Sequence, residues 1–181
     1  MTAVDWASVR TRVSTLAAHD PDGPCPVSPP LAEERVAEAE GRLGFTFPAE
    51  YRAYLRQVSA GGWFVDELRC TERGWGWRSP VAPVPGLAFL AARGEGCAVG
   101  LAVAGPARGT MWMDNRALHP EPWPLLTEDG RPATFGEWLV DWLDHREPLI
   151  GATREQHGQV MYCWLMGVET PIDWCPPPTG R

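Results

Sequence analysis

The chain has 181 residues, of which 44% are hydrophobic and 22% charged, so its size and composition are those of one globular domain rather than of a disordered segment. All 16 basic residues are arginine, which excludes a Walker-type phosphate loop, a Schiff-base lysine and a lysine general base. With 23 acidic residues the formal net charge is 16 − 23 = −7, and such a chain lacks the basic footprint of a nucleic-acid binder.

Three helices are predicted in the first third of the chain. Apolar residues at helical spacing predict an amphipathic helix over residues 4–18. A proline-rich loop follows, and the second helix is expected to start near Pro30 and to end at Gly44, which can adopt the left-handed conformation of a helix cap. The third helix is expected to begin at Pro48 and to stop at the glycine pair 61–62.

Short apolar runs between Gly and Pro residues predict a small sheet in the middle of the chain. The candidate strands are residues 87–91, 98–104 and 110–114. The last two are expected to form a hairpin around the glycine-containing turn 105–109.

A fourth helix is predicted from Thr134 to about His145, because Glu137 follows Thr134 at the spacing of a capping box. Its apolar stripe is expected to face the core and consists of Phe135, Trp138, Leu139, Trp142 and Leu143. We also expect a further helix over about residues 153–168 and an extended proline-rich segment at 176–178.

No targeting or membrane segment is visible in the sequence. The amino terminus lacks a basic stretch followed by an apolar one, and the longest weakly polar run, residues 97–104, is far shorter than the ~20 residues that span a bilayer. We therefore expect a cytoplasmic protein without a membrane partner. The five cysteines are widely spaced and form no C-x-x-C pair, so they predict reduced, mostly buried thiols rather than a disulfide framework or a zinc ribbon.

Three stretches of the sequence, taken in order, resemble the SUKH superfamily. In residues 36–62 a helix ends in Leu-Gly, a short link ends in Phe-Pro, and a tyrosine-bearing helix runs to Gly-Gly. Residues 99–114 are similar to the central hairpin of the family, whose second strand often ends in Trp and Asp, and residues 134–143 resemble its closing Phe-x-x-Trp helix. The chain departs from the family at Phe47, where Leu is usual, and at Ala60-Gly61, where Asn-Gly is common.

The resemblance covers about residues 30–145 and implies an α+β fold in which helices pack against a largely antiparallel sheet. It implies neither catalytic machinery nor a cofactor. We therefore expect a single SUKH-like domain over residues 1–150 and a carboxy-terminal extension over residues 151–181. Bacterial members of the family are commonly immunity proteins that bind and neutralise a toxin domain, often a nuclease. Fungal relatives of the Smi/Knr type are cell-wall and signalling regulators.

Sequence signatures of common enzymes are absent. The chain has no H-E-x-x-H and no G-x-S-x-G motif, and residues 94–100 miss the dinucleotide-binding pattern by one position. His157 and Cys163 leave a cysteine-dependent enzyme open as a minor alternative, and with Cys175 they form a conceivable metal set whose spacing fits no common zinc module. Structural thiols are the preferred interpretation, so no catalytic residue and no metal ligand is assigned.

Two surfaces are candidates for contact with a partner. Trp75 and Trp77 stand in a glycine-rich stretch that is predicted to be a loop, and tryptophan is enriched at interface hot spots. Together with nearby acidic residues they make up a first candidate surface: Asp66, Glu67, Glu72, Trp75, Trp77 and Asp114. The alternative stays open that at least one of the two tryptophans covers a sheet edge. The tryptophans on strand and helix stripes, Trp112, Trp138 and Trp142, are expected in the core.

The second and weaker candidate surface is the acidic face of the last helix, formed by Glu137, Asp141 and Asp144. A solvated helix surface is the simpler explanation, and docking against a basic protein is the alternative. Residues 1–115 carry 13 acidic and 11 basic side chains, a balance of −2, whereas residues 116–181 carry 10 and 5, a balance of −5. A basic partner is therefore expected to favour the carboxy-terminal third.

These features predict a non-catalytic protein-binding domain, and foremost an immunity protein that neutralises a cognate toxin by stoichiometric binding. The expected partner is a basic toxin domain, for which a nuclease is one candidate, and direct binding of nucleic acid is not expected. The alternative is a regulatory adaptor of the Smi/Knr type that recruits proteins without inhibiting them. The sequence does not indicate an oligomeric state.

Overall fold

The computed structural model describes residues 3–20, 26–77, 84–92, 97–115 and 119–151, and the predicted segments 153–168 and 176–178 lie outside them. In chain order the elements are α1 (Trp6–Ala18), α2 (Glu33–Leu43), α3 (Ala49–Gln57), β1 (Arg69–Thr71), β2 (Gly74–Gly76), β3 (Leu87–Ala92), β4 (Ala98–Ala102), β5 (Met111–Asp114), β6 (Trp123–Pro124), α4 (Phe135–Arg146) and the short 3-10 helix η1 (Glu147–Leu149). Helices and antiparallel strands occur together, so the predicted α+β fold is confirmed.

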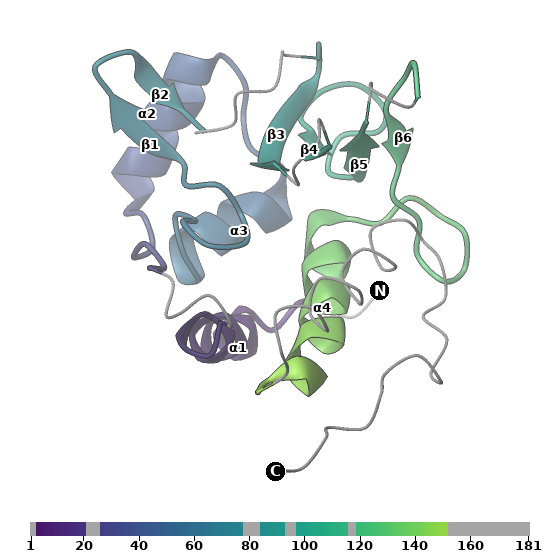
Figure 1. The fold of residues 1–181 in the computed structure, drawn as a ribbon. Coiled ribbons are helices and arrows are strands. Elements are labelled where there is room, and N and C mark those ends of the chain that lie inside the picture. Colours follow the sequence, from purple (N-terminus) through teal and green to yellow (C-terminus); the bar gives the residue numbers. More distant parts are fainter. Residues whose placement is uncertain (1–2, 21–25, 78–83, 93–96, 116–118, 152–181) are drawn as a thin grey trace.

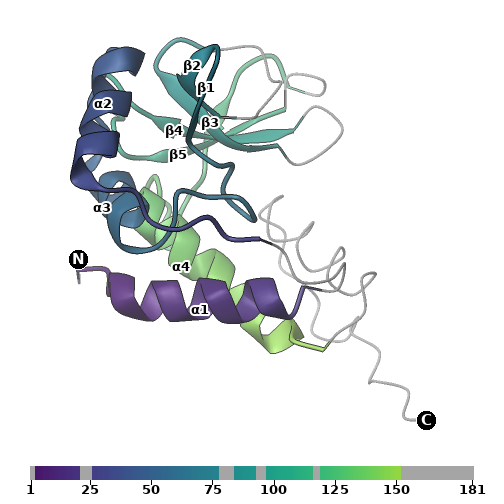
Figure 2. The same cartoon turned by 90° about the vertical axis from the view of Figure 1, so that its left-hand side faces the viewer.

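Three of the four described α-helices lie on one side of the strands, and α2 lies beside the small sheet (Figures 1 and 2). Figures 1 and 2 show the strands above α1, α3 and α4, with α2 beside β1 and β2. The main sheet is antiparallel with the strand order β3-β4-β5-β6, and β1 and β2 form a separate two-stranded sheet. Helix α3 packs against α1, α2 and α4 and so lies at the centre of the helical layer. Among the described residues, none of the helices combines the length and the apolar character that crossing a bilayer requires.

Helix α2 starts later than the sequence predicts. It begins at Glu33 rather than near Pro30. The backbone N–H of Leu31 donates to the carbonyl of Leu55 at 2.8 Å, so this segment is extended and pairs with the end of α3. The predicted end of the helix is confirmed, because Gly44 has φ 78° and its N–H closes the last turn in the left-handed conformation that glycine adopts without strain.

Helices α1 and α4 both begin with a side-chain cap. The carboxylate of Asp5 accepts a hydrogen bond from the backbone N–H of Ala7 at 3.1 Å. At the start of α4, Thr134 and Glu137 form the predicted capping box, in which each side chain accepts a hydrogen bond from the other residue's backbone N–H. These caps satisfy N–H groups that the first helical turn leaves unpaired, which is why the predicted helix positions are confirmed here.

The apolar stripe of α4 is buried as predicted and consists of Phe135, Trp138, Leu139, Trp142 and Leu143. The ring of Trp142 stacks on Phe64 with 3.6 Å between the ring centroids, and the edge of Trp63 approaches it at 5.1 Å. Trp138 and Trp142 therefore lie in the core, as expected. Trp112 differs from the expectation, because it is half-buried on β5.

The predicted central strands are confirmed with small shifts, and three further strands appear. Strand β4 ends at Ala102, and the turn of the hairpin uses Gly105 and Gly109 at φ 72° and 95°. The strands β1, β2 and β6 were not predicted. They contain two or three residues each, which is shorter than the runs of about 4–8 residues that an alternating pattern can reveal.

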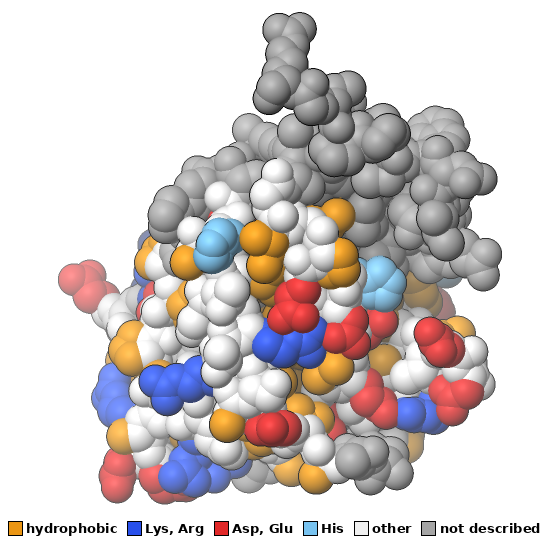
Figure 3. Space-filling model, turned by 90° about the horizontal axis from the view of Figure 1, so that it is seen from below, with side chains coloured by type: hydrophobic (Ala, Val, Ile, Leu, Met, Phe, Trp, Pro, Cys, Tyr) orange, Lys and Arg blue, Asp and Glu red, His pale blue; other side chains and the backbone are white. Residues whose placement is uncertain are grey.

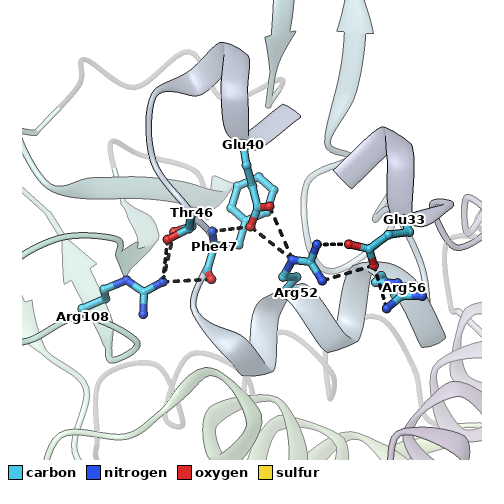
Figure 4. A network of polar contacts seen from close by, with 7 residues as sticks. All are labelled: Glu33, Glu40, Thr46, Phe47, Arg52, Arg56 and Arg108. Atoms are coloured by element: carbon cyan, nitrogen blue, oxygen red, sulfur yellow. Dashed lines mark hydrogen bonds and ion pairs between the residues drawn. The ribbon is translucent and has the colours of Figure 1, made fainter. Parts of the chain in front are cut away.

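A network of polar contacts holds the link between α2 and α3 in place (Figure 4). Arg52 of α3 forms ion pairs with Glu33 and Glu40 of α2, and the carboxylate of Glu40 also accepts from the backbone N–H of Phe47 at 2.8 Å. From the β4–β5 turn, Arg108 donates to the carbonyl of Phe47 at 2.9 Å. The link is thus held by α2 and by the β4–β5 turn, while Arg52 joins α3 to α2. Such a network contributes more to stability than isolated exposed ion pairs do.

Candidate partner-binding surface

Trp75 does not lie on an exposed loop. The glycine-rich stretch forms β2, and its pairing with β1 places Trp75 opposite Cys70. Trp75 is 9% exposed and belongs to the hydrophobic core, where the guanidinium of Arg35 lies 4.6 Å from the ring centroid. The loop prediction is therefore wrong for residues 74–76, and Trp75 attaches the β1–β2 hairpin to α2.

Trp77 is half-buried and attaches the same hairpin to α3. Its indole N–H donates to the hydroxyl of Tyr51 at 2.8 Å, and its ring meets that of Phe47 with 6.2 Å between the centroids. Tyr51 is fully buried, and this burial raises the pKa of its hydroxyl, which stays neutral. Both tryptophans therefore pack against the fold, as in the alternative that the sequence left open.

The four acidic residues of the first candidate surface lie in different environments. Asp114, the last residue of β5, is 1% exposed and so is not part of an accessible surface. Asp66 and Glu67 are half-buried, and Glu67 accepts a hydrogen bond from the hydroxyl of Ser28 at 2.6 Å. Glu72 is exposed at the turn of the β1–β2 hairpin. Of the six residues in this candidate surface, Glu72 alone is fully presented to solvent.

Each acidic residue of the second candidate surface lies beside an arginine or a histidine. The pairs are Glu137 with Arg131 at 2.8 Å, Asp144 with Arg12 at 2.5 Å, and Asp141 with His145 at 3.4 Å. The face of the molecule seen from below shows acidic and basic side chains interspersed rather than a patch of one sign (Figure 3). This arrangement fits the simpler interpretation of the face of α4 as a solvated helix surface.

The partners of these carboxylates shape the electrostatics of α4. The guanidinium of Arg131 is the main cause that lowers the pKa of Glu137 to about 2, and the backbone N–H of Thr134 adds to the effect. Arg12 joins α1 to Asp144 and to Glu147 of η1, and the hydrogen bond to Glu147 raises the pKa of its guanidinium. The sequence analysis did not single out these arginines, because their partners stand 6 to 135 positions away, outside any helical spacing.

Charged side chains without a partner lie elsewhere on the surface. In the described part of the chain, the side chains that form neither a hydrogen bond nor an ion pair are those of Glu34, Glu72, Glu121 and Glu128 among the acids, and of Arg10, Arg42, Arg69 and Arg73 among the bases. The exposed large hydrophobic side chains of the same residues are Leu126, 59% exposed, and Ile150, 42% exposed. Neither was singled out by the sequence.

Within residues 3–20, 26–77, 84–92, 97–115 and 119–151, no group of three or more His, Cys, Asp or Glu side chains is placed to hold a metal ion. Both described cysteines are free thiols, but Cys70 is exposed on the short strand β1 and Cys97 is half-buried, so the expectation of burial is wrong for Cys70. The residues of the cysteine-enzyme and metal alternatives, His157, Cys163 and Cys175, lie outside the described residues, so those alternatives stay predictions.

The described residues thus form an α+β domain, and the two candidate sites that the sequence predicts lie on its surface and at its β1–β2 hairpin. Residues 30–95, which contain α2, α3 and β1 to β3, match the model of the SMI1 / KNR4 family (SUKH-1). This match supports the membership of the chain in the SUKH superfamily, in agreement with the resemblance. The β4–β5 hairpin and α4, which carry the other two similar stretches, lie outside the matched range. A comparison with curated proteins gave no match.

Proposed function

We propose that this SUKH-domain protein is a non-catalytic binding protein that acts as an immunity protein. It neutralises a cognate toxin by binding it in a one-to-one complex and covering its active surface. The observation that carries the proposal is the family match over residues 30–95, because bacterial members of this superfamily commonly have this role.

The partner in this proposal is a basic toxin domain. The chain has a formal net charge of −7, and 10 of its 23 acidic residues fall in residues 116–181 against 5 of its 16 arginines. A toxin that cleaves nucleic acid holds phosphate groups with basic side chains. An acidic inhibitor opposes that charge, which speeds association and selects the partner.

Three perturbed ionisable groups of the described chain have structural rather than catalytic causes. Burial raises the pKa of Tyr51 and Tyr54 in α3, and Arg131 lowers the pKa of Glu137 at the start of α4. Each of these groups has a structural environment that explains its pKa. A catalytic role is favoured when such a group lies in a cleft with access to substrate, and these groups lie in the core or in a helix cap.

The proposal is tested by capture followed by titration. The full chain carries a tag, is incubated at moderate salt with lysate of the cells that produce it, and its co-purifying proteins are identified by mass spectrometry. The captured protein is then produced in pure form, and its toxic activity is measured while the chain is added in steps. Neutralisation by occlusion predicts that activity falls linearly and ends at one chain per toxin.

Other results would contradict the proposal in distinguishable ways. Loss of toxin activity at a small fraction of one equivalent would indicate catalytic inactivation, and a Cys163→Ser variant would then test the cysteine-dependent alternative. Capture of several unrelated regulatory proteins, none of them toxic, would favour a regulatory adaptor of the Smi/Knr type. An empty capture would remove the support for a protein partner.

A further inference from the structure

The loop that follows β6 carries the most exposed large hydrophobic side chain of the described residues. Leu126 is 59% exposed, whereas its neighbour Leu125 is half-buried against the core. In Figure 1 this loop projects from the right-hand side of the molecule, beyond the edge strand β6 of the main sheet. A single exposed leucine is common on protein surfaces, so its meaning depends on how it is held and on what surrounds it.

The backbone around Leu126 is held by a ladder of hydrogen bonds. Thr127 N–H donates to the carbonyl of Arg131 at 2.9 Å, Gly130 N–H donates to Thr127 at 2.9 Å, and Leu126 forms a β-bridge with Pro132. On the side of the sheet, Leu125 N–H donates to the carbonyl of Met111 at 2.9 Å. Leu126 therefore projects from a turn whose geometry is fixed in the free protein. Such an anchor loses little conformational entropy when a partner covers it.

Arg131 stiffens the same loop through its side chain. It forms ion pairs with Asp129 in the turn and with Glu137 in the first turn of α4. The hydroxyl of Thr127 and the guanidinium of Arg131 lower the pKa of Asp129, in that order. The loop is thus connected to the start of α4. Asp129 and Glu137 are already paired with Arg131, so they are less available to a partner.

Two further carboxylates of this region have no partner in the described chain. Glu121 precedes β6 and Glu128 lies in the turn after Leu126, and both side chains are exposed and form neither a hydrogen bond nor an ion pair with the described chain. Over residues 119–132 the formal charge is 1 − 3 = −2, from Arg131 against Glu121, Glu128 and Asp129. An apolar anchor in an acidic surround favours a basic partner.

The β1–β2 hairpin is the competing surface and lacks this combination. Its exposed charges are Arg69, Glu72 and Arg73, none of which has a partner in the described chain, so their signs are mixed. Its large side chain, Trp75, is buried beneath it. The acidic face of α4 is likewise weaker, because Glu137 and Asp144 already form ion pairs with arginines.

We infer that residues 119–132 form the docking surface for a basic protein, with Leu126 entering an apolar depression on that protein and with Glu121 and Glu128 facing its arginine or lysine side chains. The inference rests on the proposed function for the existence of a basic partner. Truncation of an apolar anchor at an interface centre weakens binding by about tenfold or more. Removal of the two rim charges lowers the association rate at low salt and has little effect at high salt.

The surface is tested by site-specific crosslinking in the full chain. One protein carries p-benzoylphenylalanine in place of Leu126, and a matched control carries it in place of the exposed Thr71 on β1. Both are irradiated in lysate of the producing cells, and adducts are identified by mass spectrometry. The protein crosslinked from position 126 is then purified and serves as the probe for direct binding to the parent, to Leu126→Ala and to the double variant Glu121→Gln, Glu128→Gln. Thermal unfolding of each variant shows that it is folded.

The expected result is an adduct from position 126 and not from position 71, to a protein with an excess of Lys and Arg. Leu126→Ala is expected to bind that protein about tenfold more weakly, and the double variant to associate more slowly at low salt alone. The inference is overturned if the adduct forms from position 71 alone, if neither position crosslinks, if the crosslinked protein is acidic, or if Leu126→Ala binds like the parent. If the parent captures a toxin and neutralises it but no adduct forms from position 126, the proposed function stands and the assignment of the docking surface is wrong. If position 126 crosslinks a basic protein that is not toxic, the surface stands and the immunity role is wrong.

Discussion

The carboxylate of Glu50 in α3 accepts a hydrogen bond from the backbone N–H of Gly136 in the first turn of α4, at 2.9 Å. The first turn of a helix presents unpaired N–H groups and the positive end of the helix dipole, so a carboxylate is a favourable partner there. Glu50 lies in the first stretch that resembles the SUKH superfamily and Gly136 in the third. The contact therefore joins two parts of the family pattern that stand 86 positions apart.

Replacement of Glu50 measures this contact. Glu50→Gln keeps an acceptor and loses the charge, so it is expected to lower the free energy of unfolding by about 0.3–1 kcal/mol. Glu50→Ala also removes the acceptor and is expected to cost about 1–2 kcal/mol. Urea unfolding measures both values, with Glu72→Gln as the control, because Glu72 is exposed, lies outside the helices and has no partner in the described chain. Equal stability of Glu50→Ala and the parent would show that the contact contributes nothing.

Gly61 is expected to tolerate no side chain. Its φ is 111°, and an added Cβ would lie 2.6 Å from the carbonyl oxygen of Asp66 and 2.7 Å from the Cα of Glu67, both of them backbone atoms. Gly61→Ala is therefore expected to lower the free energy of unfolding by at least about 2 kcal/mol. Gly76→Ala is the matched control, because a Cβ there meets nothing within 4 Å. If chemical denaturation shows the two variants to be equally stable, the close approach at Gly61 is not as described.

The hydrogen bond between Trp77 and Tyr51 predicts unequal effects of its two partners. Trp77→Phe leaves the buried hydroxyl of Tyr51 without this donor and is expected to cost about 1–3 kcal/mol. Tyr51→Phe leaves the half-buried indole N–H, which can turn to water, and is expected to cost about 1 kcal/mol or less. A double-mutant cycle from denaturant unfolding should give a coupling between the two residues. Strict additivity would contradict the bond. Both tryptophans pack against the fold. Replacing Trp75 and Trp77 together by alanine would therefore destabilise the protein, and a loss of partner binding in that variant would not show a direct contact.

The low pKa of Glu137 predicts a stability difference that depends on pH. Its pKa is about 2 in the folded protein against an ordinary value of 4.5, so its stabilising contribution is complete above about pH 4.5 and is lost as the pH falls towards 2. Glu137→Gln is therefore expected to be less stable than the parent by about 1 kcal/mol near neutral pH, with the difference shrinking below pH 4.5. Urea unfolding at several pH values tests this. A difference that stays constant down to the acid range would contradict the assignment.

The features that could be predicted from the sequence are those that short-range interactions control. The helical periods of α1, α3 and α4, the capping box of Thr134 and Glu137 and the left-handed cap at Gly44 all depend on residues within a few positions of each other. The β4–β5 hairpin follows from two apolar runs and a turn between them. Local propensity and the tertiary structure agree at these places, so the sequence pattern was sufficient to predict the elements and their caps.

Which side chains are available to a partner depends on contacts between segments that lie far apart in the chain. Trp75 is buried because α2 covers β2, and Asp144 is neutralised by Arg12, which stands 132 positions earlier. Leu126 is exposed because a turn at the sheet edge directs it away from the core, while Leu125 beside it points inward. Strands as short as β1, β2 and β6 owe their pairing to neighbours rather than to their own pattern. The burial of a hairpin residue such as Trp75 and the pairing of charges far apart in the chain depend on contacts between distant segments, so the local pattern did not predict them.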